Sequence, residues 1–314
     1  MLLALPAMRL FRHVLRQFPL YLMGHSERLA LVAYDLKAET IHSVDQAAMA
    51  YFYLDDAFLP SPLCSFFSSF SLILAFSGKG GRTLSKNLEK AGAACVLTLP
   101  SFPLEGLRVH VSDYLIELLR KKGIEGKVPD HPLQLSEEAL NFSRDYLARS
   151  GLKENERILA IHPGSGNPAK NWSPSHFAEV ADWAAGRARI LLISGPARDG
   201  VEEVRGNLKK VTPLIAENLS LLQLSAILKR CTAYLGNDSG ITHLASSLGL
   251  PTVALFGPTD PEVWGPRGTS VRILFGRRPE PPFFSGPKSH RYAPCPVNHL
   301  EPNEVIAVLA PLFG

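Results

Sequence analysis

Two short segments in the second half of the chain combine small residues, polar side chains and a cation. One runs from Ile161 to Trp172 and the other from Gly236 to His243. Each follows an apolar, β-branched run and precedes a helix-like pattern. Such strand-to-helix turns expose free backbone N–H groups, and α/β folds bind phosphate-bearing ligands there. Together the two segments predict a site for a diphosphate that carries a reactive group.

The second segment is predicted to form a turn that favours an anion. Asp238 is expected at the helix cap, with Ser239 and Gly240 opening the helix, so that N–H groups of the first turn point to the sheet edge. Gly240 would let a phosphate approach closely, and His243 can donate to a phosphate oxygen. Asp238 would repel a phosphate and is expected to accept hydrogen bonds from sugar hydroxyls. The alternative is that Asp238 only caps the helix and His243 is a satisfied interior histidine.

The first segment supplies the positive charge. Gly164, Ser165 and Gly166 offer backbone amides and one hydroxyl, and Lys170 is the counter-charge for a leaving diphosphate. A lysine in a loop is more often simply solvated. A phosphate-binding role for Lys170 is favoured because the lysine follows a glycine loop at a strand end and precedes the helix start predicted at Ser173-Pro174.

The elements that must position these residues alternate between strands and helices. In the second half we predict strands at 157–161, 189–194, 233–235 and 252–256, and helices at 174–185, 220–230, 239–248 and 302–312. A Pro-, Gly- and Arg-rich surface loop is expected at 276–298. The Ser220…Gln223 pair predicts a capping box. This βαβαβ series indicates a Rossmann-like domain.

The first half shows a similar, less regular alternation. We predict an amphipathic helix at 2–18, strands at 20–23, 71–76 and 95–99, and helices at 83–91, 111–122 and 136–149. The pattern favours an α/β fold with a parallel sheet. With 314 residues, the chain is long enough for two domains, which we place at 1–152 and 153–314.

Composition narrows the function classes. A net charge of +4 is too weak to indicate a nucleic-acid partner, although it suits an acidic substrate or an anionic membrane surface. The four cysteines have neither zinc spacing nor a disulfide pattern, which favours a reducing cytoplasm. We find no apolar run of the roughly 20 residues that span a bilayer, and no secretory signal. Neither a dinucleotide glycine fingerprint nor a P-loop is present, so a dehydrogenase or an ATPase is disfavoured.

Four motifs in order resemble glycosyltransferase family 9, the ADP-heptose:lipopolysaccharide heptosyltransferases. They lie at 162–165, 170–172, 236–243 and 256–261. The resemblance implies an α/β fold of the GT-B type, with two Rossmann-like domains facing across a cleft. The first domain would bind the acceptor and the second the nucleotide sugar. The implied reaction is inverting: a carboxylate takes a proton from an acceptor hydroxyl, which attacks the anomeric carbon as ADP departs.

The same resemblance implies a role for each site residue. Lys170 would neutralise the departing diphosphate and Asp238 would bind hydroxyls of the transferred sugar. The other substrate-binding residues would be Gly164, Ser165, Leu219, Ser239, Gly240 and His243. Of these, Leu219 would lie by the adenine. No cofactor or metal is required, because the lysine and the helix terminus supply the electrostatic stabilisation.

The implied partners are an ADP-sugar donor and a lipopolysaccharide core or lipid A acceptor at the inner membrane surface. A cytoplasmic protein is expected, peripheral to the inner face of the bacterial inner membrane. The basic residues of the first domain suit an acidic acceptor, although a solvated face explains them equally well; they are Arg9, Arg12, Arg16, Lys79 and Arg82.

The chain departs from the family pattern at its start. Family members begin with a strand and a glycine-rich loop ending in Gly-Asp, whose aspartate is the general base, whereas this sequence begins at the following helix. Loss of a central strand would leave neighbouring strands with unpaired edges, so we expect a start placed too late in the reading frame. A chain that truly lacks the base would bind the sugar nucleotide with little or no transfer.

Two other functions stay open at this stage. One is a non-catalytic sugar-nucleotide-binding protein, and the other is a GT-B-like epimerase of nucleotide sugars, which would need cleft carboxylates and no acceptor. A further departure is that Pro196-Ala197-Arg198-Asp199 stands where some family members carry a ribose-binding Glu. Recognition of the nucleoside is therefore less firmly implied than recognition of the diphosphate.

Overall fold

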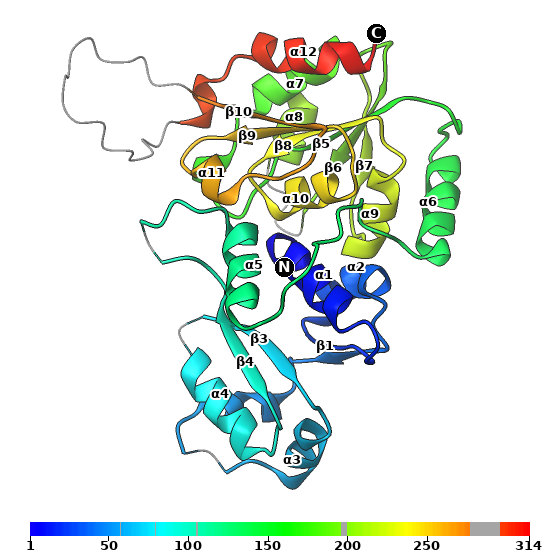
Figure 1. The fold of residues 1–314 in the computed structure, drawn as a ribbon. Helices are drawn as coiled ribbons and strands as arrows, with labels where there is room; N and C mark the ends of the chain where they lie inside the picture. Colours follow the sequence, from blue (N-terminus) through cyan, green and yellow to red (C-terminus); the bar gives the residue numbers. More distant parts are fainter. Residues whose placement is uncertain (57, 79, 105, 196–199, 277–295) are drawn as a thin grey trace, which may run out of the picture. The chain divides into compact units, whose positions relative to one another are not determined.

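The computed structural model describes residues 1–314 except 57, 79, 105, 196–199 and 277–295 (Figure 1). The chain divides into two compact units, Leu3–Asp130 and His131–Gly314. The sequence placed the division after residue 152, one helix later. Helix α6 (Glu137–Arg149) belongs with the second unit because it packs against α9 (Leu221–Leu228), and the Tyr146 hydroxyl donates to the carbonyl of Ile215 at 3.3 Å.

The second unit is built on a six-stranded sheet in the order β10-β9-β8-β5-β6-β7, parallel throughout. The strands are β5 (Ile158–His162), β6 (Arg189–Ile193), β7 (Leu214–Ala216), β8 (Ala233–Asn237), β9 (Thr252–Phe256) and β10 (Val271–Phe275). Every residue of β5, β8 and β9 is buried, as expected for parallel strands covered on both faces. This is the strand order of a doubly wound dinucleotide-type sheet.

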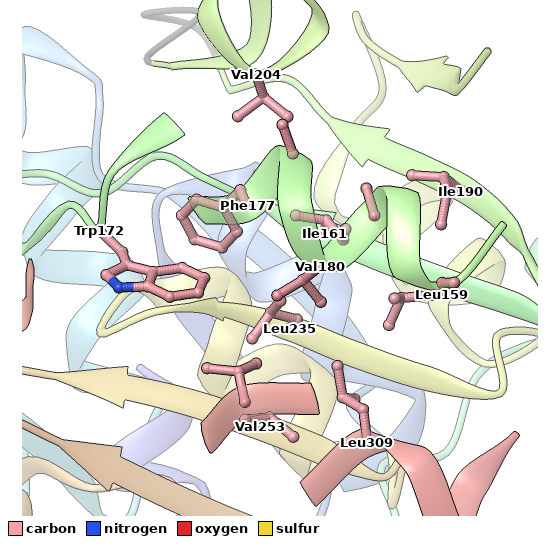
Figure 2. Close-up of a cluster of buried hydrophobic side chains, with 14 of the residues drawn as sticks. Leu159, Ile161, Trp172, Phe177, Val180, Ile190, Val204, Leu235, Val253 and Leu309 are labelled. Atoms are coloured by element: carbon pink, nitrogen blue, oxygen red, sulfur yellow. The ribbon is translucent and has the colours of Figure 1, made fainter. Parts of the chain in front are cut away.

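Helices cover both faces of this sheet (Figure 1). One face carries α7 (Pro174–Trp183), α8 (Val201–Asn207) and α12 (Pro302–Leu309), and the other carries α9 and α10 (Gly240–Ser247); the short α11 (Pro261–Trp264) follows β9. Figure 2 shows the core under the first face. There, Leu159 and Ile161 of β5 and Leu235 of β8 pack against Phe177 and Val180 of α7. Side chains at alternate positions of these strands point into this core. The packing therefore fixes how each strand is oriented where it ends at the edge of the sheet.

The local signals for helix ends behave as predicted at two positions. Ser173 occupies the N-cap position of α7, with Pro174 at the first helical position, although its hydroxyl bonds to Ser175 rather than to a helix N–H. Ser220 and Gln223 form both hydrogen bonds of the capping box on α9. The predicted strands and helices of the second half are confirmed with small shifts at their ends. The sequence pattern did not predict α8, β7, α11 or β10; of these, β7 has three residues and β10 is partly exposed.

The first unit contains two separate two-stranded parallel sheets. Strand β1 (Tyr21–Gly24) pairs with β2 (Thr40–Ser43), and β3 (Ile73–Ser77) pairs with β4 (Val96–Pro100). The helices of this unit are α1 (Leu5–Val14), α2 (Ser26–Leu36), α3 (Ser61–Ser68), α4 (Gly81–Lys90) and α5 (Val111–Lys121). Sequence analysis missed α2, β2 and α3.

An apolar cavity of about 860 Å³ lies in the first unit. Residues of β1 and β3 both line it, together with Met8 and Phe11 of α1 and Leu15 directly after that helix. Within the described residues, β1 has β2 as its neighbour and β3 has β4. Among the described residues, β1 and β3 thus each have one edge without a neighbouring strand.

Helix α1 is shorter than predicted, and its basic residues have internal partners. Arg9 forms an ion pair with Asp35 at 2.7 Å, and the Asp35 side chain has no exposed surface. The Arg12 guanidinium donates to the carbonyls of Leu36 and Phe18 at 3.0 and 2.9 Å. Both side chains thus hold this unit together, which weakens the expectation that they meet an acidic acceptor.

No helix in the described parts of the chain is both long and apolar enough to cross a bilayer.

Candidate functional site

The two segments singled out in the sequence meet at one edge of the second sheet. Strands β5 and β8 are neighbours, with His162 opposite Gly236 at their carboxyl ends. The chain leaves β5 toward α7 on one face and leaves β8 toward α10 on the other (Figure 1). Neighbouring strands whose helices go to opposite faces form the switch point at which open α/β sheets bind ligands.

An ion pair joins the two segments at this point. The Lys170 ammonium donates to Asp238 Oδ2 at 2.6 Å. The Asp238 side chain is 9% exposed and the Lys170 side chain 28% exposed, so the carboxylate is held inside while the ammonium remains accessible to a ligand. This pairing brings together the two residues predicted to act on the reacting groups.

The start of α10 corrects one expectation. The helix cap is Ser239, whose hydroxyl accepts a hydrogen bond from Thr242 N at 3.3 Å, rather than Asp238. Asp238 is therefore free to pair with Lys170, because the serine hydroxyl satisfies the helix donor. Gly240 is exposed, and a Cβ added there would meet no atom within 4 Å. The first turn of α10 thus offers open space next to its free N–H groups, as an anion site requires.

The loop after β5 has an internal scaffold. Ser165 donates through its hydroxyl to the carbonyl of Asn167 at 2.7 Å. Asn167 in turn caps a short 3-10 turn, Pro168–Lys170, through its bond from Ala169 N at 3.0 Å. Gly164 is buried and Ser165 is half-buried. The Ser165 hydroxyl therefore stabilises the turn that carries Lys170, in addition to any contact with a ligand.

The remaining predicted residues lie near the carboxyl edge of the same sheet. Leu219 is half-buried between β7 and the cap of α9, two strands from β5. His243 is half-buried in the first turn of α10. The Pro196–Asp199 turn and most of the predicted 276–298 loop lie outside the described residues.

Sequence reasoning gave no role to Asn237 or Tyr234. Asn237 has no exposed surface, and its side-chain amide bonds to the backbone of the loop after β5. Tyr234 is equally buried and its hydroxyl lies 3.0 Å from Thr242 Oγ1. Burial raises the pKa of the Tyr234 phenol above its usual range, and it raises the pKa of the Cys231 thiol to about 12. Both groups therefore stay protonated near neutral pH and serve packing.

Position 236 of β8 has room only for glycine, because the Tyr234 side chain lies against it. A Cβ at this position would lie 2.8 Å from Tyr234 Cζ and 3.0 Å from the carbonyl oxygen of His162. Gly236→Ala should destabilise the protein by about 1–3 kcal/mol, because neither buried neighbour can move away. Urea unfolding would measure the loss. Gly240→Ala, which adds the same methyl to open space, should leave stability unchanged or higher. Equal midpoints for wild type and Gly236→Ala would contradict the expectation.

The described residues contain no group of three His, Cys, Asp or Glu side chains placed to hold a metal ion. Among them, the Lys170 ammonium and the start of α10 bring positive charge to the site.

Known proteins share this fold and sequence pattern. The chain is 28% identical over 199 residues to lipooligosaccharide heptosyltransferase 2 of Haemophilus influenzae, covering 55% of this chain and 56% of the relative. It spans about half the length of the curated relatives it matches.

Two solved structures align over the whole chain. A glycosyltransferase family 9 protein from Veillonella parvula aligns with a TM-score of 0.78 at 19% identity, covering 100% of this chain and 94% of that one. Escherichia coli ADP-heptose LPS heptosyltransferase II aligns with a TM-score of 0.71 at 18% identity, covering 100% and 95%. These alignments confirm the predicted α/β fold of the GT-B type.

The family model described as glycosyltransferase family 9 (heptosyltransferase) matches residues 93–292, more than half of the chain. This match includes β5, β8 and both segments that form the Lys170–Asp238 pair. The chain therefore belongs to glycosyltransferase family 9, the heptosyltransferases.

Proposed function

We propose that this protein is an inverting glycosyltransferase that moves heptose, or a related sugar, from an ADP-sugar to a lipopolysaccharide core acceptor. The observation that carries the proposal is the Lys170–Asp238 pair beside the open first turn of α10. One solved neighbour is described as an ADP-heptose LPS heptosyltransferase, and the motifs shared with the family are the ones that build this site.

The proposed chemistry follows from the charges at the site. The acceptor oxygen forms a new bond to the anomeric carbon as the bond from that carbon to the diphosphate breaks, and the acceptor proton passes to a base. Negative charge grows on the departing diphosphate. The Lys170 ammonium and the N–H groups of α10 are placed to stabilise that charge, with His243 as a further donor. Gly164 and Ser165 lie in the loop that carries Lys170. Ser239 and Gly240 stand at the start of α10. Leu219 is proposed to contact the adenine.

Asp238 is proposed to orient the sugar rather than the phosphates. Its carboxylate lies next to Lys170, so it can accept hydrogen bonds from sugar hydroxyls while the ammonium turns to the diphosphate. Hydrogen bonds to a charged group contribute about 1.5–3 kcal/mol each. In this proposed arrangement, the bond that breaks lies between the Lys170 ammonium and the Asp238 carboxylate.

The acceptor is proposed to reach the protein at the inner face of the inner membrane. A lipopolysaccharide precursor is amphiphilic and acidic, and the net charge of +4 is compatible with such a partner. Acceptor binding is assigned to the first unit, by resemblance to the family.

The test is an incubation of the protein with ADP-heptose, with and without de-acylated core acceptor, together with calorimetric titration of ADP. The proposal expects ADP binding by the chain, and acceptor-dependent release of ADP with a matching gain in acceptor mass. A chain without its general base would bind ADP but transfer about 100- to 10,000-fold more slowly. Absence of ADP binding would overturn the proposed donor, and release of an isomerised sugar without acceptor would indicate an epimerase.

A further inference from the structure

One buried side chain connects the two halves of the candidate site. Asn237 is the last residue of β8 and has no exposed surface. Its Nδ2 donates to the carbonyl of Pro163 at 2.6 Å, and its Oδ1 accepts from the backbone N–H of Trp172 at 3.0 Å. Pro163 is the first residue after β5, and Trp172 directly precedes the cap of α7. A single amide therefore holds both ends of the loop that carries Lys170.

The chemistry of these partners requires an amide. The Pro163 carbonyl needs a donor and the Trp172 N–H needs an acceptor, and among short side chains only the amide of asparagine supplies both from adjacent atoms. A carboxylate would offer two acceptors, so one would face the Pro163 carbonyl. An apolar residue would leave two backbone groups without partners in the interior, which is costly. The orientation of the Asn237 amide is fixed by the same two partners.

The hydrogen bonds of Asn237 are made close in sequence to Lys170. Lys170 stands two residues before Trp172, and the Trp172 side chain is 1% exposed with its indole N–H donating to the carbonyl of Leu300 at 2.9 Å. The next residue after Asn237 is Asp238, the partner of Lys170. Asn237 thus sets the distance between the lysine loop and the turn before α10 from a position that solvent and ligand do not reach.

We propose that Asn237 is a positioning residue. It fixes the Pro163–Trp172 loop, and with it Lys170, where the Lys170 ammonium can contact the bound diphosphate. The inference rests on the proposed function for its ligand, since it assigns Lys170 to a diphosphate. A displacement of about 1 Å in such a group can lower catalysis about 100-fold. Asn237 itself touches neither donor nor acceptor, and acts only through the loop.

The test compares wild type with Asn237→Asp, which has nearly the same shape. When its carboxyl is ionised, the variant has no donor for the Pro163 carbonyl. We expect its affinity for ADP to fall at least about tenfold, because Lys170 is displaced, with adenosine affinity within about twofold of wild type. Hydrogen exchange should be faster at the backbone N–H groups of residues 164–171 other than Pro168.

Thr252→Val is the matched control. Thr252 is buried at the beginning of β9, at the other end of the sheet, and its hydroxyl donates to the carbonyl of Leu250 at 2.7 Å. This variant also removes one buried hydrogen bond from the second unit. It should lower the melting temperature while ADP affinity and exchange in 164–171 stay as in wild type. Asn237→Ser, which buries no charge and is too short to bridge both loop ends, goes through the same measurements, so that displacement of Lys170 is separated from repulsion by a new carboxylate.

Three results would each overturn the positioning role: ADP affinity in the variants equal to that of wild type, an equal loss of affinity for ADP and for adenosine, or unchanged hydrogen exchange in residues 164–171. If wild type itself does not bind ADP, the proposed donor fails. Hydrogen exchange alone then decides whether Asn237 holds the loop.

Discussion

Lys170→Met should weaken ADP binding about 10- to 100-fold, because a charge-assisted contact to the diphosphate contributes about 1.5–3 kcal/mol. Methionine keeps the length of the side chain and removes the charge. In a transfer assay the turnover number should fall further, about 100- to 1,000-fold, since the charge on the leaving group is greatest in the transition state. Adenosine binding should not change. Calorimetry with ADP and adenosine and a kinetic assay of ADP release measure these effects.

Lys153→Met is the control for this substitution. Lys153 is an exposed lysine of the same unit, before β5, and its loss should leave ADP affinity as in wild type. The salt dependence provides a second check, because the contribution of Lys170 is electrostatic and should diminish at high ionic strength. If ADP binds equally well to wild type and Lys170→Met, the cation has no role at the diphosphate and the site is assigned wrongly.

Asp238→Asn should change donor binding and transfer in opposite directions. In the free protein Asp238 holds the Lys170 ammonium at 2.6 Å, so the diphosphate competes with this carboxylate. Removing the negative charge frees the ammonium and removes repulsion, and ADP should bind about 2- to 10-fold more tightly, in line with one hydrogen bond of about 0.5–1.5 kcal/mol. Transfer should fall about 10- to 100-fold, because the sugar hydroxyls lose their charged acceptor.

The double variant Lys170→Met/Asp238→Asn makes this prediction sharper. If the tighter ADP binding of Asp238→Asn comes from the freed ammonium, it should disappear when methionine replaces Lys170, and the two substitutions should be non-additive. Glu217→Gln removes an exposed carboxylate of the same unit, at the end of β7, and tests whether the overall charge is responsible. Weaker ADP binding by Asp238→Asn would contradict the competition between carboxylate and diphosphate.

Local patterns in the sequence were enough for most strands and helices of the second unit, although α8, β7, α11 and β10 there, and α2, β2 and α3 in the first unit, were not predicted. The apolar runs that became β5, β8 and β9 are buried on both sides, so burial and strand formation coincide. The capping signals at Ser173 and Ser220 depend on neighbours within one helical turn. The glycine-rich segments and Lys170 were recognisable because phosphate chemistry needs those residue types at a strand end. The family match over residues 93–292 agrees with the resemblance drawn from these motifs.

Only the folded chain decided which residues meet. Residues 170 and 238 are far apart in sequence, and their ion pair exists because β5 and β8 are neighbours in the sheet, which no local pattern specifies. The cap at Ser239 and the role of Asn237 depend on backbone direction and on partners across the sheet. The sequence by itself therefore determined the family, most of the regular elements of the second unit and the residue types that stand at each strand end. Tertiary structure alone selected the contacts, because strand order is the outcome of long-range packing.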